Sequence, residues 1–382
     1  MKQWKLAALV AACVLAACGG GGNSGETKQS ITSVKVVGAS LADMGVFGHK
    51  YTMRSASANT TYQVYSERIA AAYGITGFCK SYAFTAPATF DLQAGCSNFA
   101  VAGASVNNYS FTNHAEVASV PVSVIKQLVD AGTAGYGAQD LLLVGEASAN
   151  DAAALATAAG TSTQNFVELL SSLLGQQTAV GLLSTDQTGQ SAGVAYMQAL
   201  ADKLTTAISA NALSKGAQRV VVLNTLDVTR TPKFKALLAS YSQAQADATQ
   251  ALVRAWIVAY NTRLASNVAA LGSKVALVDL YQSFNDELDN PAQYGLINTS
   301  TTVCDEIVNG GATPGVTSLN VQSVVDACTD AAASSITPSA GGDGTSNWWK
   351  KALFADNFHP TPYGHQLLAQ LVAKRLTEAG WL

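Results

Sequence analysis

Two patterns of apolar residues alternate along the chain. Short β-branched or fully apolar runs, typical of buried parallel strands, occur at 34–38, 140–145, 219–224 and 274–280, with a shorter fifth candidate at 98–101. Apolar residues recur at helical spacing in 62–73, 120–129, 166–174, 196–213, 234–271 and 367–376. This alternation predicts an α/β fold, a three-layer α/β/α sandwich around a mainly parallel sheet of about five strands.

The N-terminal segment has the pattern of an export signal. Lys2 and Lys5 precede an apolar run at 6–17 that is too short to span a bilayer, so residues 1–17 are predicted to be a signal peptide. The string Leu-Ala-Ala-Cys ending at Cys18 resembles a bacterial lipobox, which implies that Cys18 is lipidated and becomes the first mature residue. An ordinary signal peptide with an incidental cysteine is the alternative.

The residues after Cys18 predict how the protein is held. Segment 18–30 is rich in glycine and polar residues, so we expect a flexible tether between a lipid anchor and the domain. Position 20 is glycine and not aspartate, so by analogy the inner-membrane retention signal is absent. We therefore expect an outer-membrane lipoprotein that faces the periplasm or the cell surface. Because neither an internal repeat nor a change of composition follows, residues 31–382 are predicted to form a single domain with insertions.

Composition excludes several classes of protein. Hydrophobic residues make up 48% of the chain and charged residues 12%, which is the opposite of a disordered chain. The formal net charge is −3 and there is no long basic run, so a nucleic-acid partner is not expected. Without an apolar run of about 18 residues, a polytopic membrane protein is excluded as well. We expect a monomer that contacts the membrane through its lipid anchor.

The cysteines agree with export. Cys13 leaves with the signal peptide and Cys18 would carry lipid, which leaves four: Cys79, Cys96, Cys304 and Cys328. An even number in an oxidising compartment favours two disulfides, and four cysteines allow three connectivities. We predict the local pairing, 79–96 and 304–328, because it closes the shortest loops. A zinc site is the weaker reading, because the spacing is not that of CxxC and the cysteines lack a nearby histidine.

Candidate reactive residues follow the predicted strands. In a parallel sheet, functional sites gather where the carboxyl ends of the strands meet. Ser40 follows the first strand, Gly103 the short fifth candidate and Asn150 the strand of the 140s. Near the end of the chain, Asp356 and His359 are spaced so that both side chains can project to one side of a single turn. Together these residues supply a nucleophile, a base with its orienting carboxylate, and polar donors.

These blocks, in this order, resemble the SGNH, or GDSL-type, hydrolase superfamily, which has a flavodoxin-like fold. From about Val34 to the C-terminus, four segments are similar to its motifs GDSLxDxG, the glycine block, GxND and DxxHPT: Gly38–Gly45, Asn98–Ser105, Ser148–Asp151 and Asp356–Thr361. Segments 222–232 and 290–295 look like the lecithinase and thermolabile-hemolysin branch. Two positions depart from the motifs, since Ala39 replaces an aspartate that supports the nucleophile turn and Ser148 replaces a glycine.

The resemblance implies roles for individual residues. Ser40 would be the nucleophile, His359 its base and Asp356 the orienting acid. The oxyanion would be held by the backbone N–H groups of Ser40 and Gly103 and by the side-chain amide of Asn150. The implied activity is that of a serine esterase or lipase acting on acyl esters or lipids through an acyl-enzyme, with neither metal nor cofactor. The same site would serve a carbohydrate O-acetyl esterase, and a surface lipoprotein that binds without catalysis is the alternative from another class.

Three further expectations concern the surroundings of the site. Trp348 and Trp349, with the glycine-rich stretch 339–346, either form an apolar flap near the site or pack under the loop that carries Asp356 and His359, which we call the histidine loop. His365 is expected to pack or cap the last helix. Asp151 is expected to be structural, as the N-cap of a helix from Ala152.

Overall fold

A parallel sheet forms the centre of the computed structural model, which describes residues 30–57, 62–86, 89–146 and 148–382. The predicted signal peptide, Cys18 and all of the tether except Ser30 lie outside the described residues. The strands are β1 (Ser33–Val37), β6 (Asp140–Val144), β7 (Val220–Leu223) and β8 (Val275–Val278), parallel and adjacent in that order. The predicted α/β fold with a mainly parallel sheet is confirmed.

The fifth predicted strand is only partly formed. Segment 97–101 runs along the free edge of β1, where Val36 N donates to Ser97 O at 2.9 Å and Phe99 N donates to Val36 O at 2.7 Å. A single ladder bridge joins Asn98 to Val36, because the Asn98 side chain turns back and accepts a hydrogen bond from Ala100 N. The segment therefore ends as a loop that leads to Gly103.

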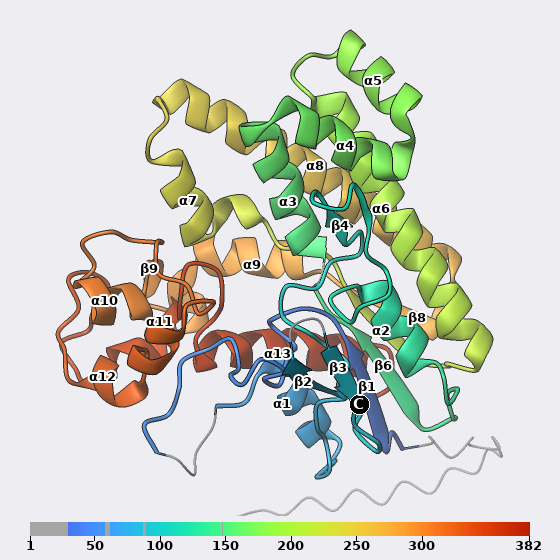
Figure 1. Ribbon diagram of the computed structural model, residues 1–382. Coiled ribbons are helices and arrows are strands. Elements are labelled where there is room, and N and C mark those ends of the chain that lie inside the picture. The colour runs from blue at the N-terminus through green and yellow to red at the C-terminus, as the bar shows by residue number, and fades with distance from the viewer. Residues whose placement is uncertain (1–29, 58–61, 87–88, 147) are drawn as a thin grey trace, which may run out of the picture.

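Helices cover both faces of the sheet (Figure 1). One layer holds α1 (Tyr65–Ala72) and α13 (Pro362–Glu378), which pack on each other. The other holds α2 (Val124–Ala131), α6 (Gln190–Asn211) and α8 (Gln243–Ala270). The remaining helices of the main body are α3 (Ser148–Thr161), α4 (Thr163–Leu174), α5 (Gln176–Thr185), α7 (Pro232–Leu238) and α9 (Leu280–Asp289).

The helix predicted at 234–271 is in fact two helices. Helix α7 ends at Leu238 and α8 begins at Gln243. The break arises because the Ser242 hydroxyl accepts a hydrogen bond from Gln245 N while the Gln245 side chain accepts one from Ser242 N, a capping box that starts a new helix.

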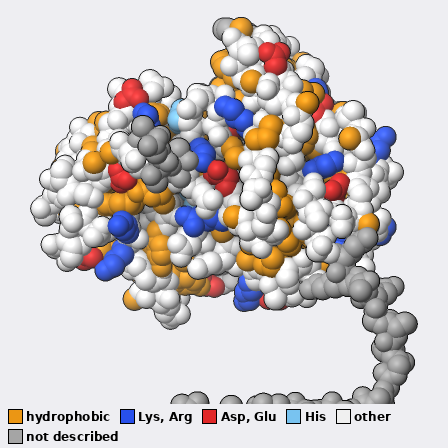
Figure 2. All heavy atoms as spheres, turned by 90° about the horizontal axis from the view of Figure 1, so that it is seen from below, with side chains coloured by type: hydrophobic (Ala, Val, Ile, Leu, Met, Phe, Trp, Pro, Cys, Tyr) orange, Lys and Arg blue, Asp and Glu red, His pale blue; other side chains and the backbone are white. Residues whose placement is uncertain are grey.

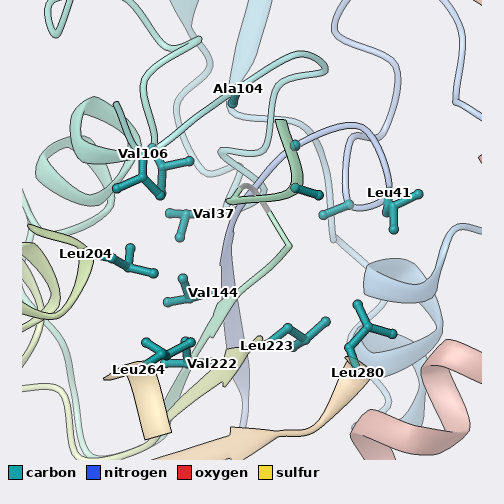
Figure 3. Packing of buried hydrophobic residues seen from close by; sticks show 14 of the residues in the cluster. Val37, Leu41, Ala104, Val106, Val144, Leu204, Val222, Leu223, Leu264 and Leu280 are labelled. Atoms are coloured by element: carbon teal, nitrogen blue, oxygen red, sulfur yellow. The ribbon is translucent and has the colours of Figure 1, made fainter. Parts of the chain in front are cut away.

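Alternate residues of the strands face opposite helical layers (Figure 3). Val222 lies beside Leu264 of α8, while its neighbour Leu223 lies toward Leu280 at the start of α9. All four side chains are buried. On the face drawn in Figure 2, charged side chains of both signs are scattered among apolar and uncharged ones, in keeping with the low charged fraction.

Small two-stranded sheets and a second lobe, which we call the small lobe, complete the fold. The hairpins are β2 (Tyr82–Ala86) with β3 (Thr89–Leu92) and β4 (Tyr109–Ser110) with β5 (Ala115–Glu116). The lobe, residues 298–351, contains β9 (Asn298–Thr302), α10 (Val303–Asn309), α11 (Gln322–Ala327) and α12 (Asp330–Ser334), and β9 pairs with β10 (Ala352–Phe354). A separate apolar core lies between this lobe and the main body, which contributes Tyr51, Met53 and Ala102 to it.

The two tryptophans belong to that core. Trp348 and Trp349 are buried, and their indole N–H groups donate to Ala333 O at 2.9 Å and to Ser334 Oγ at 3.0 Å. The packed arrangement is therefore the one that the structure adopts, and the alternative expectation of an aromatic flap is wrong. A buried indole needs a hydrogen-bond acceptor, and the turn at the end of α12 supplies one for each ring.

Both predicted disulfides are present, Cys79–Cys96 and Cys304–Cys328. The second closes a loop within the small lobe, between residues separated by 24 positions. That loop contains Leu319, whose backbone N–H donates to the Asp356 carboxylate at 2.7 Å. The disulfide therefore constrains a segment that contacts the histidine loop directly.

We expect the two disulfides to differ in their effect on activity. Replacing Cys304 and Cys328 by serine should destabilise the fold by about 3 kcal/mol in the chain-entropy model and should also lower kcat, because Leu319 is then held less firmly against Asp356. The matched Cys79→Ser, Cys96→Ser variant should lose similar stability with a smaller loss of kcat. Thermal melts and assays of ester hydrolysis, the activity that the sequence resemblance implies, check this, and equal losses of kcat in both variants would contradict it.

Candidate active site

The loop after β1 places Ser40 at the carboxyl edge of the sheet. Gly38 lies so close to β6 that a Cβ there would be 3.2 Å from the Gly145 Cα, so a glycine is needed for the two strands to end side by side. Ala39 O accepts hydrogen bonds from Ala42 N and Asp43 N, both at 3.1 Å, and these bonds close the turn that carries Ser40. The turn thus forms although position 39 carries no carboxylate.

Ser40, His359 and Asp356 form a continuous hydrogen-bonded chain. The Ser40 Oγ lies 2.8 Å from His359 Nε2, and His359 Nδ1 lies 2.9 Å from both carboxylate oxygens of Asp356. All three residues are buried, with 6% of Ser40 and 6% of His359 exposed. A carboxylate on Nδ1 keeps a proton on that nitrogen and leaves Nε2 free to accept the serine proton.

Asp356 is held as a carboxylate by its surroundings. Its oxygens accept hydrogen bonds from the backbone N–H groups of Phe358, His359 and Leu319 at 2.6–2.9 Å. Burial alone would raise the pKa of Asp356, but the attraction of His359 and these hydrogen bonds outweigh it and hold the pKa below its ordinary value. Because its pKa is lowered, Asp356 is ionised and can accept a hydrogen bond from His359 Nδ1.

Thr361 sets the direction of the histidine loop. Its hydroxyl accepts a hydrogen bond from Gly364 N at 3.1 Å and caps α13, and Pro362 occupies the first helical position. Just before the loop, β10 pairs with β9. His359 is thus held between a strand and a capped helix.

Asp43 joins the loop that carries Ser40, which we call the nucleophile loop, to the glycine block, Asn98–Ser105. One carboxylate oxygen accepts from Gly45 N and Val46 N at 2.7 and 2.8 Å, and the other accepts from Ala102 N at 2.8 Å. Burial raises the pKa of Asp43 to about 6, although these hydrogen bonds and Lys80 oppose the rise. Ala102 immediately precedes Gly103, so this carboxylate sets the distance between two of the predicted donors.

Gly103 and Asn150 line the same cavity as Ser40. Gly103 has a φ of +78°, which favours glycine, and an added Cβ would meet nothing within 4 Å. Asn150 Nδ2 donates to Ala104 O at 2.8 Å, which fixes the amide and leaves its second N–H for another acceptor. The replacement of glycine by Ser148 is accommodated, because its buried hydroxyl hydrogen-bonds to that of Thr225 after β7.

Glu146 is a buried acid that the sequence analysis missed. It follows β6 by two residues, and its carboxylate accepts from Leu41 N at 3.2 Å and from the Tyr65 hydroxyl at 3.3 Å. Burial raises the pKa of Glu146, while hydrogen bonds from its own N–H, from Leu41 and from Tyr65, and the attraction of His359, oppose that rise. A glutamate just past a fully apolar strand was the signal that could have revealed it.

The cavity at Ser40 has a volume of about 80 Å³. Besides the predicted residues it is lined by Tyr51, Ala153, Lys233, Asn320, Asn357 and Phe358. The Tyr51 ring lies 4.7 Å from the His359 ring, centroid to centroid, and packs against one face of the imidazole. A small cavity lined by a serine hydroxyl that is hydrogen-bonded to a histidine, together with Gly103 and an asparagine amide, can accommodate attack on a carbonyl carbon.

The other histidines lie apart from this chain of hydrogen bonds. His365 is buried in α13, where Nδ1 accepts from Tyr65 N at 3.3 Å, in agreement with a packing role. His49 Nε2 lies 2.8 Å from Leu319 O, and His114 pairs with Glu168 at the surface. Among the described residues, no group of three or more His, Cys, Asp or Glu side chains is arranged to hold a metal ion.

Asp151 is structural, but not as an N-cap. Helix α3 begins at Ser148, four residues earlier than predicted, and Asp151 therefore lies within its first turn. Its carboxylate accepts from Val106 N and Asn107 N, both at 2.8 Å, in the loop that follows Gly103. The predicted cap is wrong because the acceptor serves a neighbouring loop and not its own helix.

A comparison with protein-family models matches residues 34–372 to the GDSL-like lipase/acylhydrolase model, which covers well over half of the chain. The chain belongs to the GDSL-like lipase/acylhydrolase family. Its membership supports a hydrolase that acts on acyl groups. A search of curated proteins found no match.

The two disulfides of this GDSL-like hydrolase fit an exported protein. Within the described ranges, none of the helices is long and apolar enough to cross a membrane.

Glu146 of this GDSL-like hydrolase should support the base electrostatically. In Glu146→Gln, the amide oxygen can still accept from Leu41 N, but the negative charge near His359 is lost. We expect kcat to fall roughly tenfold with little change in KM, since about 1.4 kcal/mol of transition-state stabilisation corresponds to that factor. A nearby negative charge favours imidazolium, so the acid limb of the kcat/KM profile should move to lower pH when it is removed.

Tyr65→Phe is the matched control. It removes one hydrogen bond to Glu146 and leaves the carboxylate in place, so the position of the acid limb should not move. Wild-type kcat together with an unshifted acid limb in Glu146→Gln would reduce Glu146 to a purely structural residue.

Proposed function

We propose that this protein is a serine esterase or lipase that hydrolyses carboxylic esters through Ser40, His359 and Asp356. The observation that carries the proposal is the pair of contacts on His359, to Ser40 Oγ at 2.8 Å and to the Asp356 carboxylate at 2.9 Å. Membership of the GDSL-like lipase/acylhydrolase family supports the same reaction class.

In the first half of the proposed reaction, Ser40 Oγ attacks the ester carbonyl carbon while His359 Nε2 takes its proton. The negative charge moves to the carbonyl oxygen, where the N–H groups of Ser40 and Gly103 and the Asn150 amide are the proposed donors. When the tetrahedral intermediate collapses, His359 returns its proton to the alcohol oxygen and the alcohol leaves. The acyl group then remains on Ser40 as an ester.

In the second half, water replaces the alcohol. His359 takes a proton from the water as it attacks the acyl carbon, and the same donors hold the second oxyanion. Collapse breaks the bond to Ser40 Oγ, which regains its proton from His359, and the carboxylic acid is released. Asp356 keeps the imidazole oriented throughout and balances its positive charge.

We further propose that the protein is a monomeric outer-membrane lipoprotein of the lecithinase and thermolabile-hemolysin branch. The lipobox-like string ending at Cys18 supports the anchor, and segments 222–232 and 290–295 support the branch. In this arrangement the lipid anchor and the tether hold the esterase close to membrane lipids.

The reaction is tested by removing its parts. Ser40→Ala and His359→Ala should each abolish nearly all hydrolysis of p-nitrophenyl acetate and butyrate, and the double variant should lose little more, because the two residues act as one unit. Asn150→Ala should lower kcat by about 10²–10³ with little change in KM, as for the loss of one oxyanion donor. A His359→Ala enzyme that kept most of its activity would exclude this mechanism, whereas a wild-type protein without turnover would leave the binding-protein alternative.

The anchor is tested separately. Cys18→Ala should release the protein from membranes into the soluble fraction or block signal processing, because the residue that accepts the lipid is gone. Fractionation and the mass of the mature N-terminus provide the measurement, and wild-type fractionation with normal cleavage would exclude lipidation at Cys18.

A further inference from the structure

A second, larger cavity is lined by later turns of two helices that also contribute to the cavity at Ser40. Its volume is about 470 Å³, compared with about 80 Å³ at Ser40. Helices α3, α7 and α8 form most of its walls, and Figure 1 shows these helices together at the top of the view. We call it the α3–α7 groove, and its main lining residues are Ala156, Gly160, Phe234, Leu237, Leu252 and Trp256.

Two helices connect the groove to the cavity at Ser40. On α3, Ala153 lines the catalytic cavity, and Ala156, Thr157 and Gly160 line the groove. These positions are three, four and seven residues further on, so they lie on the same face of the helix over roughly 10 Å. On α7, Lys233 lines the catalytic cavity, and Phe234 and Leu237 line the groove.

The lining of the groove is that of a site for an uncharged, apolar ligand. Its residues are apolar side chains, glycines, threonines and one glutamine, with no charged residue among them. At the rim, Leu237 is 50% exposed and Tyr241 is 37% exposed. These two side chains extend the apolar lining of the groove to the protein surface.

The chemistry of the proposed reaction decides which part of an ester enters the groove. His359 must return its proton to the leaving alcohol oxygen, so the alcohol lies on the side of His359. The carbonyl oxygen faces Asn150 and Gly103. Ala153 lines the cavity one turn beyond Asn150 along α3, so an acyl chain that follows this helix away from the carbonyl carbon runs toward the groove.

We propose that the α3–α7 groove binds the acyl chain of a long-chain ester whose carbonyl carbon lies at Ser40. This inference rests on the proposed esterase function. It identifies the substrate class as esters of long fatty acids, and the groove as the determinant of chain length.

Substitutions in the groove test the proposal against matched controls. Ala156→Phe fills the groove, and Leu237→Asp places a charge at its partly exposed rim, where folding tolerates it better. Ala154→Phe on the same helix and Val258→Asp on α8 are the controls, because Ala154 and Val258 are exposed and lie outside the groove lining. The measurement is kcat/KM for p-nitrophenyl palmitate divided by kcat/KM for p-nitrophenyl acetate.

The expected result is a ratio at least tenfold lower than wild type in both groove variants and unchanged in both controls. If both groove variants keep the wild-type ratio, or if the wild-type enzyme hydrolyses acetate but not palmitate, the groove does not bind the acyl chain. A wild-type enzyme that hydrolyses neither ester would instead overturn the proposed function. The acetate measurement therefore separates the two failures.

Discussion

The loops around the candidate site depend on buried carboxylates that accept hydrogen bonds from the backbone of other loops. Asp43 holds the glycine block, Asp151 holds the loop that follows it, and Asp356 holds Leu319 of the small lobe. Where the acceptor is ionised, as at Asp356, such a hydrogen bond contributes about 1.5–3 kcal/mol, roughly twice the value for a neutral pair. A loop without ladder partners leaves its N–H groups unpaired, and a buried carboxylate can satisfy two or three of them at once.

These contacts allow residues from opposite ends of the chain to meet. Ser40 and His359 are separated by 319 positions, and the hydrogen bond between them requires that both loops be placed to within a few tenths of an ångström. The parallel sheet places the nucleophile loop at its carboxyl edge, and the β9–β10 pair with α13 places the histidine loop. Glu146 and Asp356 each accept a backbone N–H, from Leu41 and Leu319 respectively, and each interacts electrostatically with His359.

Helix α3 contributes residues to both the cavity at Ser40 and the α3–α7 groove. Its first turn carries Ser148, Asn150 and Asp151, which bind the loops around the cavity, and its later turns line the apolar α3–α7 groove. If the proposed acyl-chain site is correct, the two cavities give the carbonyl group and the hydrocarbon chain of one ester the different environments that they need. Small side chains on the exposed face of α3 leave the space for such a chain.

The sequence by itself determined the strand order along the chain, the blocks that carry Ser40, Asn150 and His359, and the two disulfides, because each depends on local spacing or on a short motif. Only the tertiary structure decided the start of α3, the burial of Trp348 and the position of Glu146. These features depend on contacts with residues that are distant in the sequence. A carboxylate that accepts hydrogen bonds from another loop leaves no recognisable pattern in the residues around it. The α3–α7 groove was likewise invisible in the sequence, because it is a space between helices whose shape is set by how they pack.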